Sequence, residues 1–158
     1  MKASQVAVVS ITLVCASLAA STAWAGSDTG HVMVVPADLQ WADVPSLPPG
    51  AKLAVIEGPM NEAVPFTVRI KLPAGYKIPA HWHPAIEHVT VISGALNMGT
   101  GDMLDPAKTM PLSMGSVAIM QPKTNHFVWV KEETIVQIHG VGPWGITYVN
   151  PADDPRKK

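Results

Sequence analysis

Two histidines and a glutamate lie close enough in the sequence to form the centre of a metal site. Only Trp82 separates His81 from His83, and Glu87 follows four residues after His83. In a β-strand, residues two apart point to the same face, so both imidazoles would lie on one side of the strand. Pro84 would end that strand, and Glu87 would return after a short turn. Two imidazoles and one carboxylate suit a divalent transition metal.

A further ligand would have to come from a distant strand, and His126 is the best candidate. It follows a proline-containing turn and opens an apolar run. The alternative is a hydrogen-bonded polar cluster without a metal, because histidines and carboxylates also form such clusters. His88 directly follows Glu87, so strand alternation predicts that it points to the opposite face.

Short strands are the elements expected to position these residues. The 158 residues include 12 Gly and 15 Pro, which separate short apolar runs, and sustained helical periodicity is absent after the first 25 residues. Strands are expected at 31–35, 52–56, 66–72, 81–83, 89–92, 95–98, 116–120, 127–130, 134–138 and 145–149. Many short strands separated by glycine and proline predict an all-β sandwich or barrel.

The segment from Gly75 to Gly94 resembles the first motif of the cupin superfamily. Five residues separate Gly75 from His81, three separate His83 from Glu87, and six separate Glu87 from Gly94. Every one of these spacings fits the family pattern. The resemblance extends over about residues 50–150.

The second cupin motif is matched less completely. Gly115 lies eleven residues before His126, as the pattern requires. Gln121 and Lys123 stand where the pattern has proline and glycine, and Val130 occupies the usual asparagine position. These departures concern the shape of the turn before His126 rather than the ligand itself.

The resemblance implies a double-stranded β-helix barrel of the cupin or jelly-roll type. It implies that His81, His83, Glu87 and His126 project inward onto one divalent transition metal, which could be Cu, Zn, Fe, Mn or Ni. Glu87 would also be catalytic, as a base, when it releases the metal. The chain resembles small, single-domain exported cupins, which are often homodimers, and its single pair of motifs implies one barrel per chain.

Three further residues are predicted to contact a substrate. Tyr76 precedes the ligand strand and is expected to line the pocket. Gln137 and His139 lie two apart in one strand, so they share a face. If that face is the interior, both would contact the substrate; the alternative is an exposed polar face.

Three function classes remain open, because cupins occupy all of them and fold alone does not decide function. The favoured class is a dioxygenase-type oxidoreductase acting on a small oxygenated or aromatic molecule. The alternatives are a redox-silent metal-dependent isomerase or lyase, and a non-catalytic barrel that binds a small ligand or metal.

The first 25 residues are typical of a cleaved secretory signal peptide. Lys2 supplies the positive charge, residues 6–20 are mostly apolar, and residues 23–25 form an Ala-Trp-Ala cleavage site. We therefore expect a secreted or periplasmic protein with no membrane association after cleavage. Cys15 is the only cysteine, so the mature protein would have no disulfide. A site rich in imidazole would take Cu or Zn outside the cytoplasm as readily as Fe.

The remaining predictions concern partners and domain boundaries. The formal charge of −1 gives no reason to expect a nucleic acid as partner. A small-molecule substrate is the partner that the cupin resemblance implies. We expect the following organisation: signal peptide 1–25, an irregular segment with a possible edge strand 26–50, the cupin barrel 51–150, and a frayed polar tail 151–158.

Overall fold

The computed structural model of the chain describes residues 30–158, so the predicted signal peptide 1–25 lies outside the described residues. Residues from Val34 to Lys158 form one compact unit, and the fold described below is that unit. No helix among the described residues is long and apolar enough to span a membrane.

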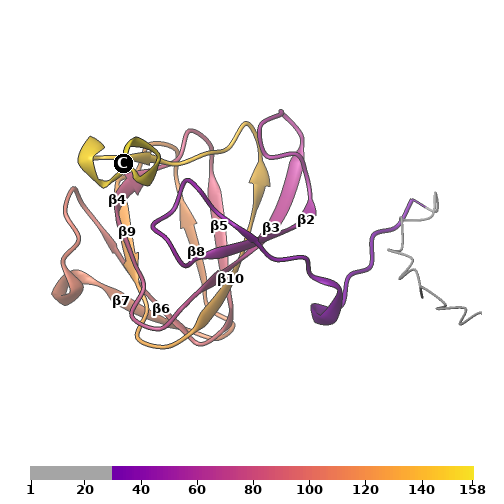
Figure 1. Cartoon of the computed structure of the whole chain (residues 1–158), viewed down its shortest axis with the longest axis horizontal. Helices are drawn as coiled ribbons and strands as arrows, with labels where there is room; N and C mark the ends of the chain where they lie inside the picture. Colours follow the sequence, from indigo (N-terminus) through magenta and orange to yellow (C-terminus); the bar gives the residue numbers. More distant parts are fainter. Residues whose placement is uncertain (1–29) are drawn as a thin grey trace, which may run out of the picture. The chain divides into compact units, whose positions relative to one another are not determined.

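Two antiparallel sheets make up the fold (Figure 1). The six-stranded sheet has the order β1-β2-β3-β10-β5-β8, and the five-stranded sheet has the order β11-β4-β9-β6-β7. The strands are β1 Ala42–Asp43, β2 Lys52–Glu57, β3 Pro65–Leu72, β4 Lys77–Trp82, β5 Glu87–Ser93, β6 Ala95–Thr100, β7 Met110–Ser113, β8 Val117–Met120, β9 His126–Trp129, β10 Thr134–Val141 and β11 Thr147–Tyr148. Four short 3-10 turns complete the fold: η1 Pro36–Asp38, η2 Pro106–Lys108, η3 Pro151–Asp153 and η4 Pro155–Lys157. This all-β architecture confirms the predicted fold class.

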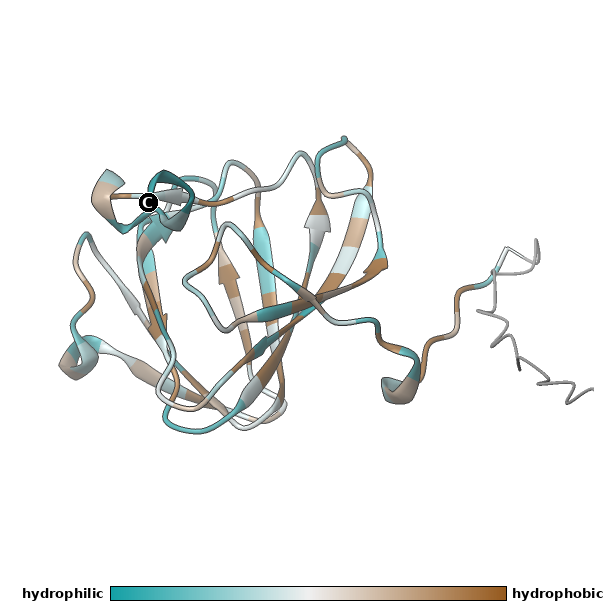
Figure 2. Ribbon diagram, viewed as in Figure 1, coloured by the Kyte–Doolittle hydropathy of each residue, from teal (hydrophilic) through white to brown (hydrophobic). Residues whose placement is uncertain are grey.

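Alternation along the central strands explains where the core lies. In β3 every second side chain from Phe66 to Leu72 is buried, while the side chains between them are exposed or half-buried. β10 and β5 follow the same rule, with Val136, Ile138, Val89 and Val91 among the buried residues. The strands in Figure 2 accordingly show alternating hydrophobic and hydrophilic bands. The two sheets thus bury one continuous apolar core between them.

Several predicted elements differ from the structure. Residues 31–35 carry no strand; the edge strand of the N-terminal segment is β1 instead. The expected strand at 145–149 shortens to β11, and β7 was not predicted because its sequence, Met-Pro-Leu-Ser, contains a proline and does not alternate. The tail 151–158 is not frayed. It forms η3 and η4, and the carboxylate of Asp154 accepts hydrogen bonds from Arg156.

Gly94 occupies the tight turn between β5 and β6, which belong to different sheets. Its φ angle is +74°, a left-handed conformation that favours glycine. A Cβ atom there would lie 2.6 Å from both the Glu133 carbonyl oxygen and Thr134 Oγ1. Thr134 is fully buried and donates to backbone carbonyls, so it has little freedom to move away.

We therefore expect Gly94→Ala to lower the free energy of unfolding by more than the ~1–2 kcal/mol that left-handed strain alone costs. Gly75→Ala is the matched control, because Gly75 has a φ of +76° but no atom within 4 Å of the position that a Cβ would take. Urea unfolding of both variants measures the difference. Equal destabilisation by the two substitutions would contradict the packing argument.

Candidate metal centre

A register shift in β4 directs His81 into the barrel. Ile78 pairs with Val128 and His81 pairs with His126, and the pairing between these two points is irregular. Without the shift, residues 78 and 81 would face opposite sides of the strand, yet both line the same cavity. Pro79 lies inside the irregular stretch and has no N–H to contribute, which is typical of a bulge.

The other three residues reach the interior from separate places. His83 follows the last residue of β4, Glu87 opens β5 in the opposite sheet, and His126 opens β9. Glu87 is buried because β5 alternates inward at Glu87, Val89 and Val91. Both sheets therefore contribute to one cluster.

The four predicted ligands come together. A nitrogen from each of His81, His83 and His126 lies within 4.8 Å of the other two. Glu87 Oε1 is 3.4 Å from His83 Nε2, and Glu87 Oε2 is 3.4 Å from His126 Nε2. All four side chains are at most 4% exposed. The carboxylate thus lies against two of the three imidazoles, inside the protein.

Backbone carbonyls fix the orientation of all three imidazoles. His81 Nδ1 donates to Pro79 O at 2.8 Å, His83 Nδ1 to Gly145 O at 2.7 Å, and His126 Nδ1 to Thr124 O at 2.9 Å. Because a carbonyl oxygen can only accept, each Nδ1 carries a hydrogen, and each neutral ring keeps its lone pair on Nε2. Metal-binding histidines are commonly held in this way.

Burial disfavours the protonated form of two of these histidines. Loss of water lowers the pKa of His81 well below its usual value, and the neighbouring His126 and His83 lower it further. The pKa of His83 is also lowered by burial, although Glu87 and the Gly145 carbonyl oppose the shift. Neutral imidazoles are the form that binds a metal.

These residues fit a divalent transition metal. The three neutral imidazole nitrogens and one carboxylate match the ligand types of Zn, Cu, Fe, Mn and Ni sites. His83 Nε2 is buried and has no hydrogen-bond partner among residues 30–158, a cost that a metal would remove. Three buried histidines close together could therefore hold a metal ion.

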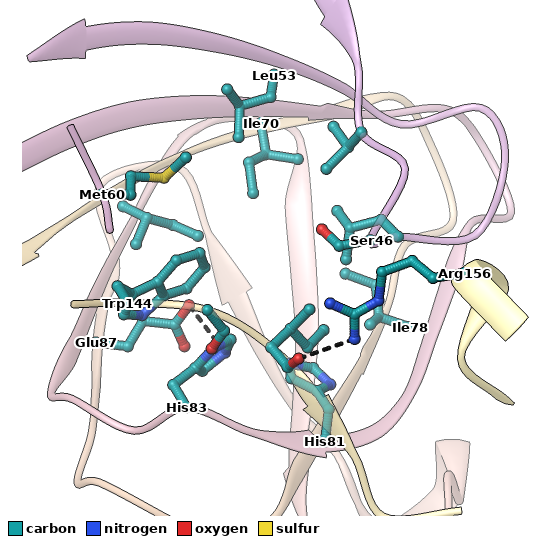
Figure 3. A pocket seen from close by; sticks show the side chains of 15 residues that line it. Ser46, Leu53, Met60, Ile70, Ile78, His81, His83, Glu87, Trp144 and Arg156 are labelled. Atoms are coloured by element: carbon teal, nitrogen blue, oxygen red, sulfur yellow. Dashed lines mark hydrogen bonds and ion pairs between the residues drawn. The ribbon is translucent and has the colours of Figure 1, made fainter. Parts of the chain in front are cut away.

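A cavity of about 210 Å³ opens beside His81, His83 and Glu87 (Figure 3). Its wall is mainly apolar, with Arg156 and Ser46 as the other polar side chains. The apolar wall consists of Val44, Leu47, Leu53, Met60, Ile70, Ile78, Ile138, Trp144 and Ile146. A cavity of ~150 Å³ is enough for benzene, so this one has room for a molecule somewhat larger than a single ring.

The three predicted substrate residues do not line this cavity. Gln137 and His139 alternate with the buried Val136 and Ile138, so they face outward, where Arg69 donates to Gln137 Oε1. The sequence of β10 alone leaves this orientation open, because Ile135 and Val141 share the alternation of Gln137 and His139. Tyr76 is buried, but its hydroxyl donates to the Pro48 carbonyl oxygen instead of facing the cavity.

The outer face of the six-stranded sheet also holds His88. Its ring stacks on that of His139, with centroids 4.7 Å apart, as expected if His88 and Glu87 point to opposite sides. Ile119 pairs with His88 and is also exposed on this face.

Two residues that line the cavity, Trp144 and Arg156, were not predicted from the sequence to do so. Trp144 stacks on His83, with ring centroids 4.4 Å apart and planes 15° from parallel. Arg156 lines the cavity from the tail, and no local pattern in the sequence indicates this.

The lowered histidine pKa values predict that the metal-free protein loses stability in acid. Below the usual pKa of 6.5, the unfolded chain gains protons that folded His81 and His83 refuse. We expect the free energy of unfolding to fall by up to ~1.4 kcal/mol per pH unit for each such histidine. Urea unfolding in chelator between pH 7.5 and 5.5 measures this, and His81→Gln should show a shallower decline. An identical slope in the variant would contradict it.

The chain matches a family model described as the ChrR cupin-like domain over residues 29–108. No curated protein sequence matches it significantly. Three solved structures share its fold. The polyketide cyclase RemF of Streptomyces resistomycificus has a TM-score of 0.63 and 12% identity, covering 79% of this chain and 89% of that chain. A proposed acetylacetone dioxygenase of Methylibium petroleiphilum has a TM-score of 0.58 and 17% identity, covering 78% and 84%.

Salicylate 1,2-dioxygenase of Pseudoaminobacter salicylatoxidans, in adducts with gentisate, has a TM-score of 0.53 and 12% identity, covering 63% of this chain and 29% of that chain. Identities this low establish a shared fold and no shared activity. With the family match over half of its length and the two antiparallel sheets described above, the chain belongs to the ChrR cupin-like family of the cupin superfamily.

Proposed function

We propose that the barrel binds one divalent transition metal through His81, His83, His126 and Glu87 and is a dioxygenase-type oxidoreductase. The observation that carries the metal site is the set of three buried imidazoles with every Nδ1 donating to a backbone carbonyl. This arrangement leaves three Nε2 lone pairs and a carboxylate facing one another in an apolar interior, with few protein partners.

A metal held by these four residues would supply Lewis-acid or redox chemistry at the end of the cavity. The protein's own groups would do the rest. Glu87 would hold the metal at rest and accept a substrate proton when its carboxylate is released. Trp144, stacked on His83, would keep that imidazole in place and exclude water from one side.

The cavity favours a small oxygenated or aromatic substrate. Its wall is mostly apolar and its volume of about 210 Å³ exceeds what one aromatic ring requires. An oxygen atom of such a molecule would reach the histidine cluster while its carbon skeleton packs against the apolar wall. The proposed activity lies outside the cytoplasm, where availability would favour Cu or Zn as readily as Fe, with Mn and Ni open.

Elemental analysis of the protein purified from its exporting host, without added metal or chelator, tests this function first. About one equivalent of Cu, Fe, Mn or Ni, followed by oxygen uptake with phenolic or diketone substrates, is the expected result. One equivalent of Zn without oxygen uptake would favour a redox-silent isomerase, a lyase or a binding protein instead.

Substitution of one proposed ligand should weaken metal binding, whereas substitution of a nearby histidine outside the site should not. We expect His81→Ala to weaken metal binding by at least ~10-fold, since even outer residues around metal sites contribute ~10–100-fold. His88→Ala is the matched control, because His88 lies next to Glu87 in sequence but stacks on His139 on the outer face. Competition titration against a chromogenic chelator measures both affinities. Equal losses in the two variants would contradict the assignment.

A homodimer that pairs the outer faces of the six-stranded sheet is also proposed. Val117, Ile119 and Val141 expose more than half of their surface on this face, which is unfavourable in a monomer. We expect sedimentation to show a dimer that Ile119→Lys weakens. Met103→Lys is the control, because Met103 is even more exposed but lies in the loop after β6. A monomeric wild-type protein would refute this.

A further inference from the structure

Arg156 brings a positive charge to a mainly apolar cavity. It lies in η4, and its guanidinium reaches from the C-terminal turn toward the cavity that His81 lines (Figure 3). The side chain is 44% exposed, so it stands at the mouth of the cavity rather than in its floor. Of the other side chains that line the cavity, only the two histidines and Glu87 are ionisable.

The hydrogen bonds of Arg156 leave one edge of the guanidinium open. Nε donates to Asp154 Oδ1 at 2.8 Å, and Nη2 donates to Asp154 Oδ2 at 2.9 Å and to Ile146 O at 3.2 Å. Arginine has five N–H groups in a rigid fork, so these contacts use three of them. Nη1 has no partner within the part of the chain that the structure describes, and its two N–H groups remain for a ligand.

Anchoring the tail does not explain why this edge stays open. Val149 N donates to Ala80 O, and Asp154 accepts from the backbone N–H of Arg156 at the start of η4. Asp154 and Ile146 fix the guanidinium from the other side, as residues that orient a binding group do. Ser46 also lines the cavity and offers a hydroxyl (Figure 3).

We propose that Arg156 determines specificity by binding the carboxylate of a small apolar substrate whose other end faces the histidine cluster. This inference rests on the proposed function, since it names the substrate class for the same site. The charges favour a monoanion. Asp154 already neutralises part of the guanidinium charge, so little positive charge remains at the cavity mouth for a dianion such as phosphate.

Calorimetric binding of benzoate and benzamide tests the proposal. The two molecules have nearly the same shape, but only benzoate carries a charge, and zinc-loaded protein prevents oxidative turnover. We expect wild-type protein to prefer benzoate. Arg156→Gln should weaken benzoate binding about 10-fold, the loss typical of one hydrogen bond to a charged group, and leave benzamide binding little changed.

Two controls distinguish recognition from support of the tail. Lys157→Gln removes the same charge from the same turn, but Lys157 does not line the cavity, so benzoate binding should not change. Arg156→Lys keeps the charge without the fork and should recover part of the affinity. Equal loss of benzoate and benzamide in Arg156→Gln would show a structural role and overturn the proposal, as would unchanged benzoate binding or no preference in wild-type protein.

Repeating the titrations after removal of zinc separates this proposal from the metal site. If zinc fails to bind at all but the preference for benzoate still depends on Arg156, the metal proposal fails and the assignment of Arg156 stands. If zinc binds and the preference for benzoate is the same in wild-type and Arg156→Gln, the metal site stands and the assignment of Arg156 is wrong.

Discussion

The structure depends on one constraint: four polar side chains are buried in the interior of an apolar barrel, and every polar atom there needs a partner. The backbone provides partners for one nitrogen of each imidazole, because each Nδ1 donates to a carbonyl oxygen. The three Nε2 atoms and the Glu87 carboxylate face inward, where their main neighbours are one another. A cation of the right size would complete their bonding, which is why the geometry supports a metal centre more strongly than a polar cluster.

The sequence was sufficient for the fold and for grouping the four ligand residues. The spacing from Gly75 to Gly94 reflects a real geometric unit: a strand end that presents two histidines, a turn, and an inward glutamate at the start of the next strand. His126, 39 residues beyond Glu87 in the chain, joins the group only because β9 pairs with β4. That pairing is a property of the family fold, so the resemblance supplied what local spacing could not.

Two kinds of feature could not be predicted from the sequence: which side of a strand points inward, and which distant segments pack against each other. The register shift at Pro79 changes which side of β4 points inward, and a prediction from simple alternation does not include such a shift. Gln137 and His139 were assigned a shared face correctly, but the choice between inside and outside required the neighbouring strands. Arg156 reaches the cavity because the tail folds back beside Ile146, a contact that leaves no periodic trace in the sequence.

The hydrogen bond between His83 Nδ1 and Gly145 O determines when, during synthesis and folding, the imidazole of His83 can be oriented. These residues are 62 positions apart, and the same late segment supplies the tryptophan that stacks on the imidazole. Closing a loop of this length costs conformational entropy, and the bond cannot form before the segment after β10 has been made and lies beside the end of β4. A chain still emerging from a ribosome or threading through a membrane pore therefore lacks the orienting carbonyl. Binding of the proposed metal would therefore follow completion of the fold, and the folded barrel would set the selectivity among metals.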